Sequence, residues 1–176
     1  ADLTKIVENN QVVFGNQYTW SSYNPTTRKV IYTQKADKLT IMDGSSQIIF
    51  TINANDQVVS YEQIYAGSVQ VLGKERELIT AQKAVEILYL AGRINSKATV
   101  QSVKLSYYQS LVLKDFSIYS PAWYIEIRQA DGQLIARRVD AIHGTVLANE
   151  TLETTNTQTQ RTTTNNTTTT QSLQQQ

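Results

Sequence analysis

The side chains able to perform chemistry are few and scattered along this chain. His143 is the only histidine among 176 residues, and cysteine is absent. A histidine pair, a His–Cys pair or a two-histidine metal site therefore cannot be assembled from this chain. A lone histidine without an orienting partner lacks the geometry for acid–base catalysis. We interpret His143, between Ile142 and Gly144, as a solvated turn residue.

Nucleophiles and paired carboxylates give no stronger signal. Serine and threonine are abundant, but no Gly-x-Ser-x-Gly or Ser-x-x-Lys sequence accompanies them, and no Gly-rich phosphate loop is present. The aspartates lie at expected turns or strand ends, where Asp favours local backbone hydrogen bonds. These are Asp43, Asp56, Asp115, Asp131 and Asp140. Neither Asp43-Gly44 nor Asp131-Gly132 continues into a calcium-ligand ladder. We therefore assign no catalytic, cofactor-binding or metal-binding residue, and we expect a protein that is not an enzyme.

Aromatic side chains form the remaining signal, and they can be interpreted in two ways. They cluster in three groups: Tyr18, Trp20, Tyr23 and Tyr32; Tyr61 and Tyr65; Tyr107, Tyr108, Tyr119, Trp123 and Tyr124. Packing within strands is the preferred interpretation, because Tyr and Trp suit a half-buried pleated surface. An exposed aromatic patch that binds a protein partner is the alternative. The sequence does not identify which residues would form such a surface.

Charge excludes some partners. Sixteen Lys and Arg against fifteen Asp and Glu leave a formal net charge of +1. Such a chain has no overall field to attract nucleic acid or an anionic membrane. No apolar run approaches the roughly 20 residues of a membrane-spanning helix, and Ala1 opens no signal peptide. If the protein is anchored, we expect the anchor to lie outside this chain.

One helix is expected to organise the domain, over residues 80–92. Thr80 is a candidate N-cap, residues 81–91 lack Gly, Pro and Asn, and Gly92 occupies the position of a left-handed C′ residue. Residues at helical spacing form an apolar stripe, and others widen it, so we expect burial on more than one side. The stripe is Ala81, Ala84, Val85, Leu88 and Ala91, widened by Ile87, Tyr89 and Leu90.

The rest of the ordered chain has the pattern of short strands joined by brief turns. Before the helix we expect β structure throughout, at 11–20, 29–33, 38–42, 47–53 and 58–65; after it we expect strands at 99–108, 111–113, 123–128 and 133–142. The resulting prediction is an α+β domain over residues 1–149, an antiparallel meander with the helix packed on the sheet. Residues 150–176, rich in Thr, Gln and Asn, are predicted to be a disordered tail.

The turn at Asp131-Gly132 allows two strand registers. A two-residue loop places Glu126 opposite Arg137. A three-residue loop, with Gly132 left-handed, sets Trp123 against Val139 and Ile127 against Ile135. The second register gathers the apolar residues on one face, and we favour it for that reason.

Several stretches, taken in order, resemble the YycI family, which is associated with the essential WalK/WalR (YycG/YycF) two-component system of low-GC Gram-positive bacteria. They are residues 80–89 leading to Ile94, 103–108 and 121–127, with 14–20, Gly44, 50–53 and 60–63 upstream. The resemblance covers roughly residues 10 to 148.

The resemblance implies a non-enzymatic regulator without cofactors. It implies a single membrane-spanning helix, an extracytoplasmic domain similar to the later domains of the YycH partner, and association with YycH and the WalK-like histidine kinase at the cell membrane. This chain departs from the pattern by lacking the anchor and part of the N-terminal ectodomain. Residues 120–147 also have the pattern of a PepSY-like terminal hairpin, so a peptidase-binding or inhibitory module is an alternative. A cell-wall hydrolase or transferase, with carboxylates clustered in a cleft, is a further one. The sign of regulation stays open.

Overall fold

The structure is a computed structural model that describes residues 2–9, 11–70, 72–148 and 169–172. The chain divides into two compact units, each described here by itself. Unit 1 comprises residues 1–69, 113–116 and 156–176, and unit 2 comprises residues 70–112 and 117–155.

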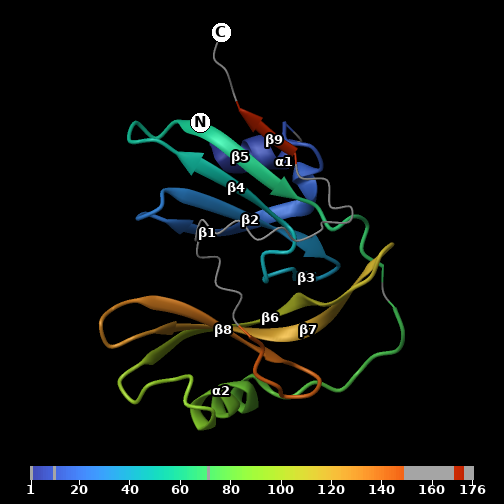
Figure 1. Cartoon of the computed structure of the whole chain (residues 1–176), viewed down its shortest axis with the longest axis vertical. Coiled ribbons are helices and arrows are strands. Elements are labelled where there is room, and N and C mark those ends of the chain that lie inside the picture. Colours follow the sequence, from blue (N-terminus) through green and yellow to red (C-terminus); the bar gives the residue numbers. More distant parts are fainter. Residues whose placement is uncertain (1, 10, 71, 149–168, 173–176) are drawn as a thin grey trace. The chain divides into compact units, whose positions relative to one another are not determined.

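Unit 1 is built on an antiparallel sheet with a short helix against one face (Figure 1). Its elements are α1 (Leu3–Glu8), the 3-10 helix η1 (Gly15–Gln17), β1 (Tyr18–Asn24), β2 (Lys29–Ala36), β3 (Leu39–Thr40), β4 (Gln47–Ile52), β5 (Val58–Ile64) and β9 (Thr169–Ser172). The strand order is β1-β2-β4-β5-β9, and β3 pairs with β2 off this path.

The core of unit 1 lies between α1 and the sheet. Val7 of α1 is buried with aromatic side chains of the strands, among them Tyr32 and Phe50, whose rings meet edge-on at 5.9 Å. Thr4 Oγ1 and the Tyr32 hydroxyl lie 3.0 Å apart, within hydrogen-bonding distance. At Gly15 a Cβ atom would lie 2.2 Å from the carbonyl oxygen of Val7. Only glycine therefore allows η1 to approach α1 this closely.

The expectation of β structure throughout the N-terminal part is wrong for its first residues. Leu3–Glu8 is helical, and of the strand expected at residues 11–20 only the last part, from Tyr18, is extended. Phe14 adopts a left-handed backbone conformation (φ 56°), and Gly15–Gln17 then forms a 3-10 turn, so the chain cannot run straight into the strand. The ring of Phe14 stacks on Tyr65 at 4.5 Å.

A buried polar network fixes the end of β5 to β2 and to the residue preceding β4. The hydroxyl of Ser46 donates to Gln34 Oε1 at 2.5 Å, and the Gln34 amide donates to the carbonyl of Gly67 at 2.9 Å. The backbone N–H of Ala66 lies 3.1 Å from the same Gln34 oxygen. Both side chains are buried, so these bonds offset the cost of removing their polar groups from water. The segment that follows β5 is therefore held in place as far as Gly67.

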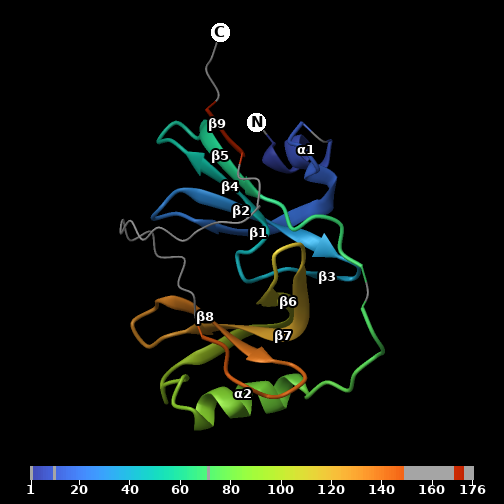
Figure 2. The ribbon, with the colours of Figure 1, turned by 45° about the vertical axis from the view of Figure 1, so that its right-hand side comes forward.

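Unit 2 consists of one helix on a three-stranded antiparallel sheet (Figures 1 and 2). Its elements are α2 (Ala81–Leu90), β6 (Thr99–Val112), β7 (Ser117–Arg128) and β8 (Leu134–Asp140), in the order β6-β7-β8. Ala84 and Leu88 of α2 are fully buried in one cluster with Ile125, Ile127 and Val139 of the sheet.

Both ends of α2 follow the sequence signals. Thr80 Oγ1 accepts a hydrogen bond from the Lys83 N–H at 3.1 Å. Gly92 is left-handed (φ 66°), and its N–H donates to the carbonyl of Tyr89 at 3.0 Å. The next N–H, of Arg93, donates to the carbonyl of Leu88 at 2.9 Å. Together these bonds form the Schellman arrangement that the glycine predicts.

Burial of α2 on more than one side, however, is a wrong expectation. Leu88 is fully buried and Val85 is half-buried, but Tyr89 and Leu90 are 59% and 74% exposed. The sheet covers a single side of the helix, and helical spacing turns residues 89 and 90 away from it.

The favoured register of the β7–β8 hairpin is confirmed. Trp123 pairs with Val139 and Ile127 with Ile135, and Gly132 is left-handed (φ 85°). The alternative is excluded, because Glu126 pairs with Ala136 and not with Arg137.

The predicted α+β class with antiparallel sheets is confirmed, with the strands divided between two sheets. Residues 99–112 form one bulged strand, β6, where two were expected.

Of the tail predicted to be disordered over residues 150–176, only Thr169–Ser172 lies within the described residues. That segment pairs with β5 as β9, because the edge of β5 offers backbone groups to any extended chain. Likeness to PepSY or YycH domains and the 1–149 domain range stay predictions. Within the described residues, no helix is long and apolar enough to span a membrane.

Candidate functional site

A buried carboxylate with several hydrogen-bond partners lies where β8 ends. Asp140 is 4% exposed, and its Oδ1 accepts hydrogen bonds from the N–H groups of Ile142 at 2.8 Å and His143 at 2.6 Å. The hydroxyl of Tyr108, on β6, donates to Oδ2 at 2.7 Å. The Asp140 N–H donates to the carbonyl of Thr145 at 2.8 Å. The carboxylate therefore organises the turn that follows the strand.

These contacts decide the ionisation of the pair. Burial alone would raise the pKa of Asp140, but hydrogen bonds from His143, Tyr108 and Ile142 outweigh it and hold the pKa below its usual range. Burial, together with the bond to Asp140 and its charge, raises the pKa of Tyr108 to about 12. Asp140 is therefore ionised and Tyr108 neutral at physiological pH. A saturated carboxylate of this kind acts as a structural cap.

His143 has a partner that the sequence did not reveal. Its Nδ1 lies 3.2 Å from Asp140 Oδ1, while its side chain is 73% exposed. The interpretation of His143 as a solvated turn residue is confirmed, but the assumption that it has no orienting group is wrong. Asp140 is its neighbour at i−3, and only the tight turn brings the two together. Among the described residues, the ring makes no other hydrogen bond.

Two of the other aspartates accept hydrogen bonds within turns, as their positions predicted. Asp43 accepts from the N–H of Ser45 at 2.9 Å, and Asp131 accepts from the N–H of Gln133 at 2.9 Å. Asp56 forms an exposed ion pair with Arg28 at 3.1 Å. Within the described residues, no group of three His, Asp or Glu side chains is placed to hold a metal ion.

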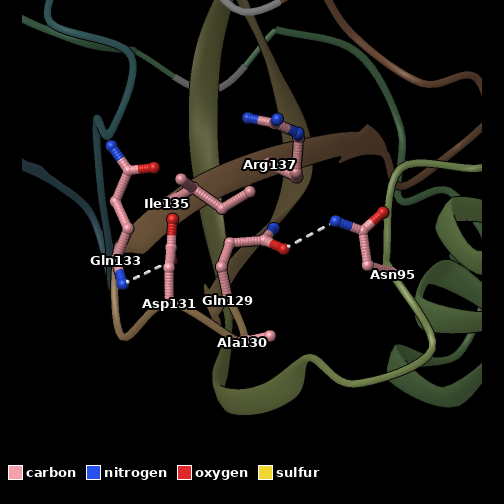
Figure 3. A pocket seen from close by; sticks show the side chains of 7 residues that line it. All are labelled: Asn95, Gln129, Ala130, Asp131, Gln133, Ile135 and Arg137. Carbon is pink, nitrogen blue, oxygen red and sulfur yellow. Dashed lines mark hydrogen bonds between the residues drawn. The ribbon is translucent and has the colours of Figure 1, made fainter.

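A shallow depression of about 380 Å³ lies at the end of the β7–β8 hairpin, beside the loop that follows α2 (Figure 3). It is lined by Asn95, Gln129, Ala130, Asp131, Gln133, Ile135 and Arg137. Asn95 Nδ2 donates to Gln129 Oε1 at 3.0 Å, which fixes the loop to the end of β7. Sequence reasoning missed this site, since its residues come from two segments that meet only in the fold.

The aromatic residues divide between packing and exposure. Tyr18, Tyr32 and Tyr61 are core residues, as the packing interpretation predicts. Trp123 is half-buried, and its Nε1 donates to the carbonyl of Ile79 at 2.9 Å. Trp20, on the edge strand β1, is exposed.

Exposed apolar side chains also gather at two places in unit 2. One is the end of α2, at Tyr89 and Leu90. The other we call the β6–β7 tip; its exposed residues in this unit are Leu111 and Val112. Exposed apolar patches of this kind are typical of protein contact surfaces.

Comparison with known protein families gives a match. The family model described as "YycI protein" matches residues 1–142 of the chain. No curated protein matches the chain.

Proposed function

The chain belongs to the YycI family, which ties it to the WalK/YycG two-component system, and we propose that it is a non-enzymatic regulator of the membrane histidine kinase. In this proposal it works with a YycH-like partner to adjust kinase activity and, through it, cell-wall homeostasis. The observation that carries the proposal is the family match over residues 1–142, which spans strands of both sheets.

Regulation without turnover is consistent with the roles of the titratable groups described above. The carboxylate of Asp140 is occupied by backbone N–H groups and by Tyr108, and Asp131 is engaged by its own turn. Groups that catalyse proton transfer need a pKa near the operating pH. The pKa of Asp140 is lowered and the pKa of Tyr108 is raised, so both lie further from neutral pH than usual.

We further propose that the domain is extracytoplasmic and joined to a single membrane-spanning helix outside this chain. A tether raises the effective concentration of the domain near a membrane kinase, so weak contacts suffice when the domain is anchored. The exposed apolar side chains at the β6–β7 tip supply surface that a protein partner can remove from water.

The experiment compares two forms of the protein in a strain that lacks the native one. The first form is this chain secreted free, and the second is the same chain behind a membrane-spanning helix. Transcription of genes controlled by the kinase is measured at matched protein abundance. We expect the anchored form to restore normal output and the free form to restore little of it.

Two outcomes would count against the proposal. Equal restoration by the free and anchored forms would refute the role of tethering. If neither form changed kinase output, and neither was retained with a YycH-like protein in a pull-down, the regulatory function itself would be refuted.

A further inference from the structure

Arg137 occupies a position where the sheet places apolar residues. It lies on β8 between Ile135 and Val139, and alternation along the strand directs all three to the face covered by α2. Its pairing partner across the hairpin, Ile125, is fully buried. Arg137 itself is half-buried, and it lines the depression.

The charge of Arg137 is not compensated within the part of the chain that the structure describes. Burial, and then the positive charge of Arg93, lower the pKa of Arg137. Neither arginine forms an ion pair with a described carboxylate, and Nη1 of the Arg137 side chain donates a hydrogen bond to the carbonyl of Ala136 at 3.0 Å. A partly desolvated cation beside a like charge is costly unless an anion joins it.

The lining of the depression supplies further donors. Because Gln129 Oε1 accepts from Asn95, the Gln129 amide nitrogen is turned towards Arg137, as Figure 3 shows. The carboxylate of Asp131 also lines the depression and would repel an anion, but its Oδ1 accepts from the N–H of Gln133 at 2.9 Å. Arg137 is therefore the cation of the lining and Asp131 its carboxylate, and the positive charge of Arg93 acts on Arg137 in addition.

We propose that this depression binds a carboxylate group carried by a ligand, with Arg137 as its cation and the Gln129 amide as an additional donor. The planar guanidinium presents paired N–H donors that fit the two oxygens of a carboxylate. A phosphate dianion carries more negative charge than a carboxylate and would meet stronger repulsion from Asp131. The site stands independently of the regulatory function proposed above.

The test uses the full chain and a pair of matched probes. The first probe is acetyl-Ala-Glu-Ala-amide, whose single charge is one carboxylate, and the second is the same peptide with Gln in place of Glu. Inorganic phosphate is a third probe, and all titrations are made at constant ionic strength. Binding is followed by chemical-shift changes of backbone amides, with the amides of Asn95, Gln129 and Arg137 as reporters.

Three variants distinguish binding in the depression from a general effect of surface charge. Arg137→Gln and Arg93→Gln remove one cation each, and Arg93 lies in a loop, where its replacement leaves the sheet intact. Lys104→Gln is the matched control, because Lys104 pairs with Tyr124 and so lies on the opposite face of the same sheet. We expect the Glu peptide to bind and Arg137→Gln to weaken binding about tenfold or more, with a smaller loss in Arg93→Gln and none in the Lys104 variant.

Other results would overturn the proposal. Equal shifts with the Gln peptide would show that the carboxylate is not recognised. Tighter binding of phosphate than of the Glu peptide would assign a phosphate site instead. If Lys104→Gln weakened binding as much as Arg137→Gln does, the binding would be a non-specific charge effect. If the Glu peptide did not bind at all, the depression would not be a site.

Discussion

Replacing Leu88 with alanine should destabilise unit 2 strongly, whereas the same change at Leu90 should have little effect. The two leucines are two residues apart in α2, so helix propensity changes almost equally at both. Leu88 is fully buried against Ile125, Ile127 and Val139, while Leu90 is 74% exposed. The comparison therefore isolates burial against the sheet from every other effect of the substitution.

The expected magnitude follows from the atoms removed. Leu→Ala deletes three carbon atoms, which at about 0.8 kcal/mol per buried methylene account for about 2.4 kcal/mol. The cavity left between α2 and the sheet adds to this, so we expect a loss of about 3 to 4 kcal/mol at Leu88. At Leu90 we expect a change within about 0.5 kcal/mol of zero.

Urea unfolding followed by tryptophan fluorescence measures both changes. Trp123 belongs to the α2 unit, where its Nε1 bonds to the carbonyl of Ile79. Trp20 belongs to unit 1, so a Trp20→Phe background makes the signal specific to unit 2. A loss below about 1 kcal/mol at Leu88, or equal losses at the two leucines, would refute the packing described for this helix.

Four further predictions follow from local features. The pKa of Tyr108 is about 12 in the folded protein, against an ordinary value of 10.0, so this tyrosine contributes stability that is present below pH 10 and is lost as the pH rises towards 12. When the free energy of unfolding is measured against pH, this alkaline loss of stability should be absent from Tyr108→Phe. An unchanged alkaline loss in the variant would contradict the prediction. In the same variant the depressed pKa of Asp140 should rise, because the carboxylate loses the hydrogen bond from Tyr108. On acidification, the stability that this carboxylate contributes at neutral pH should therefore be lost at a higher pH in the variant than in the unchanged protein. Carboxyl NMR titration measures the pKa shift. Gly132→Ala should cost about 1 kcal/mol in urea unfolding, since alanine is strained at φ 85°, and a neutral result would mean that the turn relaxes. Deleting residues 168–176 should speed amide hydrogen exchange in residues 60–63, which pair with β9; unchanged exchange would show that this pairing does not protect β5.

Features encoded by neighbouring residues could be predicted from the sequence. Thr80 and Gly92 delimit α2 because capping depends on backbone groups within one turn of each residue. Gly132 and the alternation of apolar residues set the register of the β7–β8 hairpin for the same local reason.

Features that depend on distant residues could not be predicted in this way. The helix α1 is only six residues long and is stabilised by the packing of Val7 against the sheet, which its own sequence does not show. Tyr108 and Asp140 are thirty-two positions apart, and their bond exists only because β7 lies between β6 and β8. The depression likewise needs the loop at Asn95 to meet Gln129 across thirty-four positions.

Residues 68–78 connect β5 to the residues that precede α2, and the hydrogen bonds on either side of them predict where a protease will cut. The Gln34 network holds the chain at Gly67, and the Trp123 bond holds it at Ile79. Between them, the described residues of 68–78 belong to no helix or strand and are exposed, Lys74 and Arg76 included. Brief digestion with trypsin should therefore cleave first at these two positions. Such a cut would spare every strand of both sheets, which also makes this segment a suitable place to insert an affinity tag or a fluorescent label.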